Sequence, residues 1–420
     1  MLKSINKNGN MQTLSYPNTR DILTDKKTIF LFFLVICSLK YFGAVAAQAG
    51  ILKNICYAYM VVAILMSIPN FFRYRGGFVL PIQLICIAIV ISIFMAKYTW
   101  GQGLEHSVST IPYMMWFIFF YLLGSNVSVK TIENIVLIYG LIYMLLFLFQ
   151  LTHTGTIYFG TVEEFKEDRG IIRVNFPGGG VFFLACFIAI NKVTSDLKNK
   201  MIWLAYASFG LIVNVLQVTR QTIAVMLFIY MLHFLRNVKL PLKIATIITF
   251  GLGCYLFLVS DNAISRGLAE QQKADASAGE EYIRILSARY FLTEFTPNTV
   301  SHIFGNGFFN ETSNYGKTLN ALSVNYGYFL SDVGLVEVYV VFGILAIIGF
   351  AMIFIKSFTI PVDADHYYLK YYIWMIMVTS LSSDFLVSYY YVITTALVLY
   401  CYHRLYEEQK VISMFQLKRN

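Results

Sequence analysis

The sequence predicts an all-α fold: a polytopic membrane helix bundle of about twelve transmembrane helices, with one long loop outside the membrane. First, 58% of the 420 residues are hydrophobic and only 13% are charged, whereas a soluble domain has about 25% charged residues. Second, the apolar residues form successive runs of about 20, the length at which a helix crosses a bilayer. Third, residues 261–329 form a long polar interruption of this pattern. We therefore treat residues 1–420 as a single integral membrane domain.

The predicted transmembrane helices follow one another along the chain. They cover residues 28–48, 52–70, 78–96, 107–124, 132–151, 176–191, 201–217, 221–236, 241–260, 330–355, 367–383 and 385–402. On the predicted outer side, two connections are longer than a short loop. These are a medium outer loop, residues 152–175, and the long outer loop, residues 261–329.

The basic residues predict the orientation of the bundle. The segment before the first apolar run is basic and lacks the apolar core and small-residue cleavage site of a signal peptide, so we expect a retained, cytoplasmic N-terminus. The short connections predicted to lie inside, such as residues 192–200 and 236–243, are also basic, as the positive-inside rule requires. An odd number of spans precedes residue 261, so the long loop is expected outside and both termini in the cytoplasm.

Several function classes are excluded at this stage. The net charge of +9 follows from the basic inner loops, so it does not indicate a nucleic-acid partner. The six cysteines lie in or beside apolar runs and form no CxxC pair, so they support neither a disulfide framework nor a zinc site. No nucleotide-binding loop and no HExxH spacing is present. We therefore expect no cofactor and no metal.

The long loop contains a predicted amphipathic helix. Residues 280–295 carry apolar side chains at helical spacing, so this part is expected to lie on the membrane face. It is expected to stop at Thr296 because Pro297 disfavours a helical residue before it. The following residues, Ile303 to Phe308, contain two glycines and predict a turn against the bundle.

Arginines on the predicted outer side are candidates for phosphate binding, because a guanidinium is always charged and matches phosphate oxygens with paired hydrogen bonds. They are Arg169, Arg173, Arg220, Arg284 and Arg289. Arg220 is the sharpest candidate, since it lies in a tight turn between two apolar runs. A structural ion pair is the alternative for each arginine, above all for Arg169 and Arg173, which lie beside four acidic residues.

Asp332 and Glu337 lie at the outer end of the tenth apolar run. A carboxylate at the membrane surface is costly and suits a general base, so both are candidate catalytic residues together with Arg220. The alternative for Asp332 is a helix cap, a role that Ser331 could also fill. Asp384, in the turn between the last two runs, is interpreted as an interfacial cap.

With this layout, the chain resembles the bacterial O-antigen polymerase and ligase superfamily. Three segments carry the resemblance: residues 218–222 (VTRQT), 284–308 (RILSARYFLTEFTPNTVSHIFGNGF) and 328–343 (YFLSDVGLVEVYVVFG). Arg169 also precedes Gly180 at a spacing similar to a motif of the outer loops of such polymerases, but a second copy of that motif is missing. Ligases of this superfamily carry a histidine where this chain has Ser331 and Asp332, which favours the polymerases.

The resemblance implies a GT-C-like fold and a metal-independent glycosyltransferase in the bacterial inner membrane. Such an enzyme joins oligosaccharide repeat units carried on undecaprenyl pyrophosphate into O-antigen or capsular polysaccharide on the outer face. The arginines would stabilise the departing pyrophosphate, and Asp332 or Glu337 would serve as the base. Implied partners are the lipid-linked oligosaccharide, membrane lipid, a chain-length regulator and a flippase.

Two alternatives remain open. A flippase for the same lipid-linked glycans belongs to a different class, and the large outer loop with nearly charge-free spans disfavours it. An O-antigen ligase would use the same chemistry with a different acceptor, and the sequence separates it poorly from a polymerase.

Overall fold

The computed structural model of the chain describes residues 25–160, 171–236, 240–259 and 282–417, together with three short strands. These strands are β1 (Lys3–Ile5), β2 (Met11–Thr13) and β3 (Lys166–Asp168). β1 pairs with β2, and β3 pairs with β4 (Ile171–Arg173), in two small antiparallel hairpins. The rest of the described secondary structure is helical, so the predicted all-α class is confirmed.

Each predicted apolar run overlaps a helix. In chain order, these helices are α2 (Lys26–Ser38), α4 (Gly50–Arg73), α5 (Val79–Trp100), the 3-10 helix η2 (Leu104–Phe117) with α6 (Ile118–Ser125), α7 (Val129–Thr152), α8 (Gly179–Ser195), α9 (Lys200–Leu216), α10 (Arg220–Leu235), α11 (Leu240–Val259), α16 (Leu335–Thr359), α17 (Tyr368–Thr379) and α18 (Tyr389–Leu417). Short connecting elements are α3 (Lys40–Gly43), η1 (Val45–Ala47), η4 (Leu197–Asn199) and η7 (Ala364–His366).

Among the described residues, 5 helices are long and apolar enough to cross a membrane. They are α4, α5, α7, the segment Leu197–Leu216 that contains α9, and α16. Other apolar helical segments in the described part of the chain are shorter, between 10 and 17 residues. Several apolar helices are therefore consistent with a membrane protein, whereas the count of about twelve spans stays a prediction.

Helix α8 forms the centre of the core. It packs against α7, α9, α17 and α18, and its residues from Gly179 to Asn191 are all buried. A helix that is apolar on every side belongs in the interior of a bundle. Its first turn depends on glycine, because a Cβ at Gly180 would lie 2.8 Å from Oγ1 of Thr394 in α18. Gly180 therefore permits a close crossing of α8 and α18.

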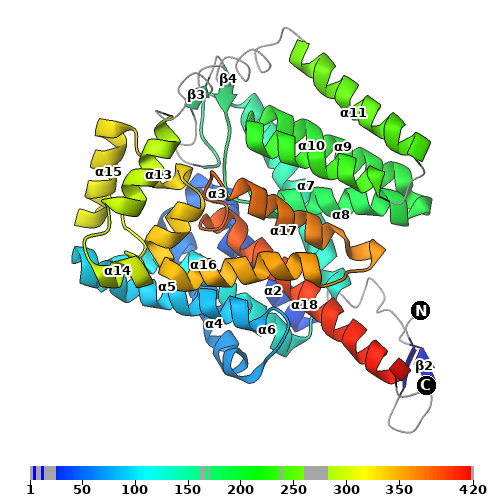
Figure 1. Cartoon of the computed structure of the whole chain (residues 1–420), viewed down its shortest axis with the longest axis horizontal. Helices are drawn as coiled ribbons and strands as arrows, with labels where there is room; N and C mark the ends of the chain where they lie inside the picture. Colours follow the sequence, from blue (N-terminus) through cyan, green and yellow to red (C-terminus); the bar gives the residue numbers. More distant parts are fainter. Residues whose placement is uncertain are drawn as a thin grey trace.

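The described part of the long polar segment, residues 282–329, folds into three helices gathered at one end of the bundle (Figure 1): α13 (Ile283–Thr293), α14 (Thr299–Phe304) and α15 (Asn314–Tyr326). The predicted amphipathic helix is confirmed as α13 but ends earlier than Thr296. Phe295 leaves the helix and stacks on Trp100 of α5, with 5.3 Å between ring centroids. The sequence analysis predicted neither α14 nor α15, and residues 261–281 lie outside the described residues.

The predicted turn after α14 inserts into a break in α16. Gly343 has φ 73° inside α16, which interrupts the helix and frees carbonyl groups of the preceding turn. The backbone N–H of Asn306 donates to the Val340 carbonyl at 2.6 Å, and that of Gly307 donates to the Val341 carbonyl at 3.0 Å. These hydrogen bonds attach the turn after α14 to α16, and α13 also packs directly against α16.

Candidate functional site

The candidate site lies where the first turn of α16, the beginning of α10 and the segment between α17 and α18 meet beside α13. The Gln221 side chain of α10 donates to the Thr379 carbonyl at 2.9 Å and accepts from the Ser383 hydroxyl at 2.9 Å. A Cβ at Gly334, before α16, would lie 2.3 Å from the Ser380 carbonyl oxygen. Three segments that are far apart in the sequence are thus held in direct contact.

The structure brings Arg284 and Asp332 together. Nη2 of Arg284 lies 3.7 Å from Oδ2 of Asp332, and Nη1 donates to the Ser382 carbonyl at 3.3 Å. The two side chains are 36% and 45% exposed, respectively. An exposed pair at this distance contributes about 0–1 kcal/mol, so an incoming phosphate can replace the carboxylate at little cost. Asp332 is not a helix cap of α16, which begins after Gly334 without a side-chain cap.

Glu337 is a buried acid in the first turn of α16. The residue is 6% exposed, and its Oε2 atom has no hydrogen-bond partner among the described residues. Its carboxyl group lies within electrostatic reach of Asp384 and Asp332. Burying a carboxyl group without a full set of partners costs several kcal/mol. Such a cost is typical of functional sites, and it separates Glu337 from an ordinary surface acid.

Asp384, which the sequence analysis interpreted as an interfacial cap, is a third carboxyl group at this site. The residue is half-buried in the segment between α17 and α18. Burial raises the pKa of its carboxyl group to about 6, and the negative charge of Asp332 adds to that effect. Its backbone carbonyl accepts hydrogen bonds from the Val387 and Ser388 amides at 2.8 and 2.7 Å. In the sequence, the feature that points to Asp384 is an acidic residue placed between two apolar runs.

Arg220 begins α10, directly before Gln221. It is half-buried and follows Val218, whose φ of 56° lies in the left-handed region. That conformation is costly for a β-branched residue, and such costs cluster at functional sites. Because Gln221 is bonded to the end of α17, Arg220 is placed beside the segment that carries Asp384.

Lys40 is a further cation at this end that the sequence analysis did not assign. Its Nζ lies 4.4 Å from the ring centroid of Tyr389, the first residue of α18. Lys40, Tyr41 and Phe42 are all left-handed, with φ between 48° and 58°. The signal in the sequence was a lysine at the predicted outer end of an apolar run, against the positive-inside tendency.

The other predicted arginines are not brought to this cluster by described contacts. Arg289 is exposed on α13 and lies about 140° around the helix from Arg284. Arg173 lies on β4, where its backbone pairs in register with Lys166. Arg169 falls outside the described residues, so its predicted role stays a prediction.

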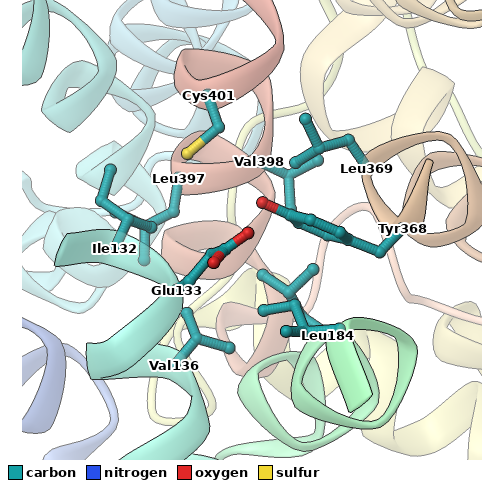
Figure 2. A pocket seen from close by; sticks show the side chains of 10 residues that line it. Ile132, Glu133, Val136, Leu184, Tyr368, Leu369, Leu397, Val398 and Cys401 are labelled. Carbon is teal, nitrogen blue, oxygen red and sulfur yellow. The ribbon is translucent and has the colours of Figure 1, made fainter. Parts of the chain in front are cut away.

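A second buried acid lies elsewhere in the bundle. Figure 2 shows Glu133 of α7 and Tyr368 of α17 pointing towards one another across a small cavity beside α18. Glu133 is paired with Lys192, whose Nζ lies 3.1 Å from its Oε2. The cavity has a volume of about 10 Å³, which is room for one water molecule at most. This acid therefore serves a structural ion pair, and it is not a site for a substrate.

The carboxyl groups near Arg284 are neighbours without forming a coordination sphere. Within the described part of the chain, no group of three or more His, Cys, Asp or Glu side chains is arranged to hold a metal ion. The arrangement offers cationic groups for an anion, carboxyl groups of differing exposure for a proton, and an apolar bundle around them. This combination defines a candidate acid-base and anion-binding site.

Comparison with known proteins adds no family: no family model matches the sequence, and no curated protein matches it significantly.

Proposed function

We propose that the protein is a metal-independent glycosyltransferase that polymerises oligosaccharide repeat units carried on undecaprenyl pyrophosphate. In this proposal, the chain forms a GT-C-like bundle of about twelve spans in the bacterial inner membrane, and the site faces outwards. The product is O-antigen or capsular polysaccharide. The observation that carries the proposal is the buried, incompletely partnered Glu337 beside the Arg284–Asp332 pair, at the beginning of a long apolar helix.

The arginines would bind the diphosphate of the growing chain. Arg284 is already oriented towards the site by the Ser382 carbonyl, and it would exchange Asp332 for a phosphate oxygen. Arg220 would approach from the beginning of α10. Fixed cations in a site shielded from water stabilise charge that develops on a leaving group more strongly than solvent does. The bond to pyrophosphate is already activated, so the reaction needs no ATP.

The reaction forms one glycosidic bond and breaks one bond to phosphate. A hydroxyl group of the incoming repeat unit attacks the anomeric carbon of the growing glycan. The bond from that carbon to the diphosphate oxygen breaks, and undecaprenyl pyrophosphate leaves with the electron pair. The hydroxyl proton passes to a carboxylate, for which Glu337, Asp332 and Asp384 are the candidates.

Asp384 has the properties that favour a base. A base works best when its pKa is close to the working pH, and the Asp384 pKa of about 6 leaves it mostly ionised at neutral pH. Asp332 is the most exposed of the three carboxyl groups, so it is the least shielded from water. Glu337 is the most buried of the three, so its charge is the most costly to maintain. We assign Asp384 to proton acceptance and Glu337 and Asp332 to positioning the reacting hydroxyl group.

The test is the glycan ladder of host cells that lack the gene and are complemented with the wild type or with variants matched for expression. Arg284→Ala is expected to shorten the ladder to a single repeat unit, and activity should fall by about a hundredfold, as when one transition-state charge contact is removed. Lys317→Ala removes an exposed cation of α15 and serves as the matched control.

The outcomes separate the candidate functions. A full ladder with wild type and with Lys317→Ala, but a single unit with Arg284→Ala, supports the polymerase. Loss of even the single unit in cells without the gene indicates a flippase or a ligase. An unchanged ladder in those cells refutes a role in glycan assembly.

A further inference from the structure

A groove lies between the loop that joins α4 to α5 and the last part of α16. Its volume is about 560 Å³. Its lining residues are Phe71, Phe72, Arg75, Gly76, Gly77, Val79, Leu80, Gln83, Leu84, Ile87, Met352 and Lys356. Glu337 and Lys356 are separated by roughly 28 Å along α16, so the groove lies at the opposite end of this helix from the candidate site.

The groove has a cationic end and an apolar length. Arg75 is exposed in the loop, and Lys356 is half-buried in the last turn of α16. Leu80 and Ile87, which are 53% and 41% exposed, follow one another along α5 for about 10 Å. Phe72, at the end of α4, is 68% exposed. The charges therefore lie at the predicted cytoplasmic surface, and the apolar side chains lead from them towards the membrane interior.

The loop that carries Arg75 is held in place by the rest of the bundle. Gly76 and Gly77 have φ of 86° and 46°, which makes a tight turn that favours glycine. A Cβ at Gly77 would lie 2.2 Å from Nδ1 of His403, and the Phe78 amide donates to that nitrogen at 3.3 Å. The loop backbone is therefore fixed against α18. A fixed loop reduces the entropy lost when a ligand binds.

The charge of the lining selects an anion. Arg75 and Lys356 are the charged residues among those that line the groove. Glu407 lies close to Gly76 but does not line the groove. Basic pockets between membrane helices on the cytoplasmic side suit the headgroups of anionic lipids. A soluble phosphate would use the two cations alone, whereas a phospholipid also covers the apolar wall with its acyl chain.

We propose that this groove binds an anionic phospholipid of the inner leaflet, with its phosphate on Arg75 and Lys356 and one acyl chain along Leu80 and Ile87. The proposal does not rest on the glycosyltransferase function, because it needs only that the chain spans a membrane with this end inside. The bound lipid fills the space between α5 and α16 and stabilises their contact from the cytoplasmic side.

The test uses the purified full-length protein in nanodiscs of phosphatidylcholine to which phosphatidylglycerol is added. Bound phosphatidylglycerol is counted by native mass spectrometry after gentle release from the disc. The groove variant is Arg75→Gln with Lys356→Gln. The matched control is Lys198→Gln with Lys200→Gln, which removes two exposed inner cations away from the groove.

We expect the wild type and the control to retain phosphatidylglycerol in preference to phosphatidylcholine. The groove variant should bind it about twenty-fivefold more weakly, since each cation near an anionic headgroup strengthens binding about fivefold. Leu80→Gln leaves both cations in place and should also weaken lipid retention. Because Leu80 is exposed, this second variant is expected to fold normally.

Three results would overturn the proposal. One is equal retention of phosphatidylglycerol by the wild type and the groove variant. Another is equal retention of phosphatidylglycerol and phosphatidylcholine by the wild type. The third is protection of the wild type against thermal unfolding by inorganic phosphate alone to the same degree as by phosphatidylglycerol, which would identify a phosphate site without a lipid.

Discussion

Asp384→Asn is expected to make the protein more stable and less active. In the folded protein, the pKa of this carboxyl group is raised from 3.8 to about 6, so the folded state binds more protons than the unfolded state between these two values. The contribution of this carboxyl group to the free energy of unfolding is therefore most favourable below pH 4, and it is lost as the pH rises through about 6. Each pKa unit corresponds to 1.36 kcal/mol, so ionised Asp384 lowers the free energy of unfolding by roughly 3 kcal/mol at pH 7.5.

Asparagine has nearly the same shape but carries no charge, so the variant avoids this cost. The assay is thermal unfolding of both proteins in the same detergent at pH 5 and pH 7.5. The unfolding temperature of Asp384→Asn is expected to exceed that of the wild type most at pH 7.5 and by less at pH 5. Leu381→Ala, a change of an exposed side chain in the same segment, is the control and should show no such dependence on pH.

Activity should change in the opposite direction. If Asp384 accepts the hydroxyl proton, polymerisation by the wild type falls as the pH drops below about 6, because the carboxylate becomes protonated. Asp384→Asn should lose about a hundredfold or more at every pH. A variant that is less stable than the wild type at pH 7.5, or that keeps full activity with the same pH profile, would refute the reasoning.

Two further changes test the scaffold. Gly343→Ala places a Cβ 2.3 Å from the Ile303 carbonyl oxygen at a residue with φ 73°, so it should lower the free energy of unfolding by about 3 kcal/mol or more. Thermal unfolding measures this loss. The control is Gly251→Ala, whose Cβ meets no atom within 4 Å and which should leave stability unchanged. Lys192→Met leaves the buried Glu133 without its cation and should lower the free energy of unfolding by about 2 kcal/mol. This loss is smaller than for a fully buried ion pair because Lys192 is partly exposed. Adding Glu133→Gln should restore most of that loss, and a double variant as unstable as the single one would contradict the pairing.

Local patterns in the sequence were sufficient for most of the helices. A run of apolar residues long enough to cross a bilayer must satisfy its backbone hydrogen bonds internally, and the helix does this. The same reasoning located α13 and the glycine turn after it. It missed the short helix α14, and it missed α15, whose sequence is polar and lacks a long apolar run. It also placed the end of α13 too late, because the departure of Phe295 depends on a ring of α5 that is distant in the sequence.

Residue chemistry in the sequence singled out Arg220, Arg284, Asp332 and Glu337, because charged groups are expensive near a membrane and therefore conspicuous. Which of them meet was decided by tertiary structure. Arg284 pairs with Asp332 because α13 packs against α16 and against the short helical turn Leu330–Asp332 that precedes it. The raised pKa of Asp384 requires burial by segments that are remote along the chain. Apolar periodicity is a local property that a sequence displays directly, whereas desolvation and charge pairing depend on distances that only the packed bundle sets.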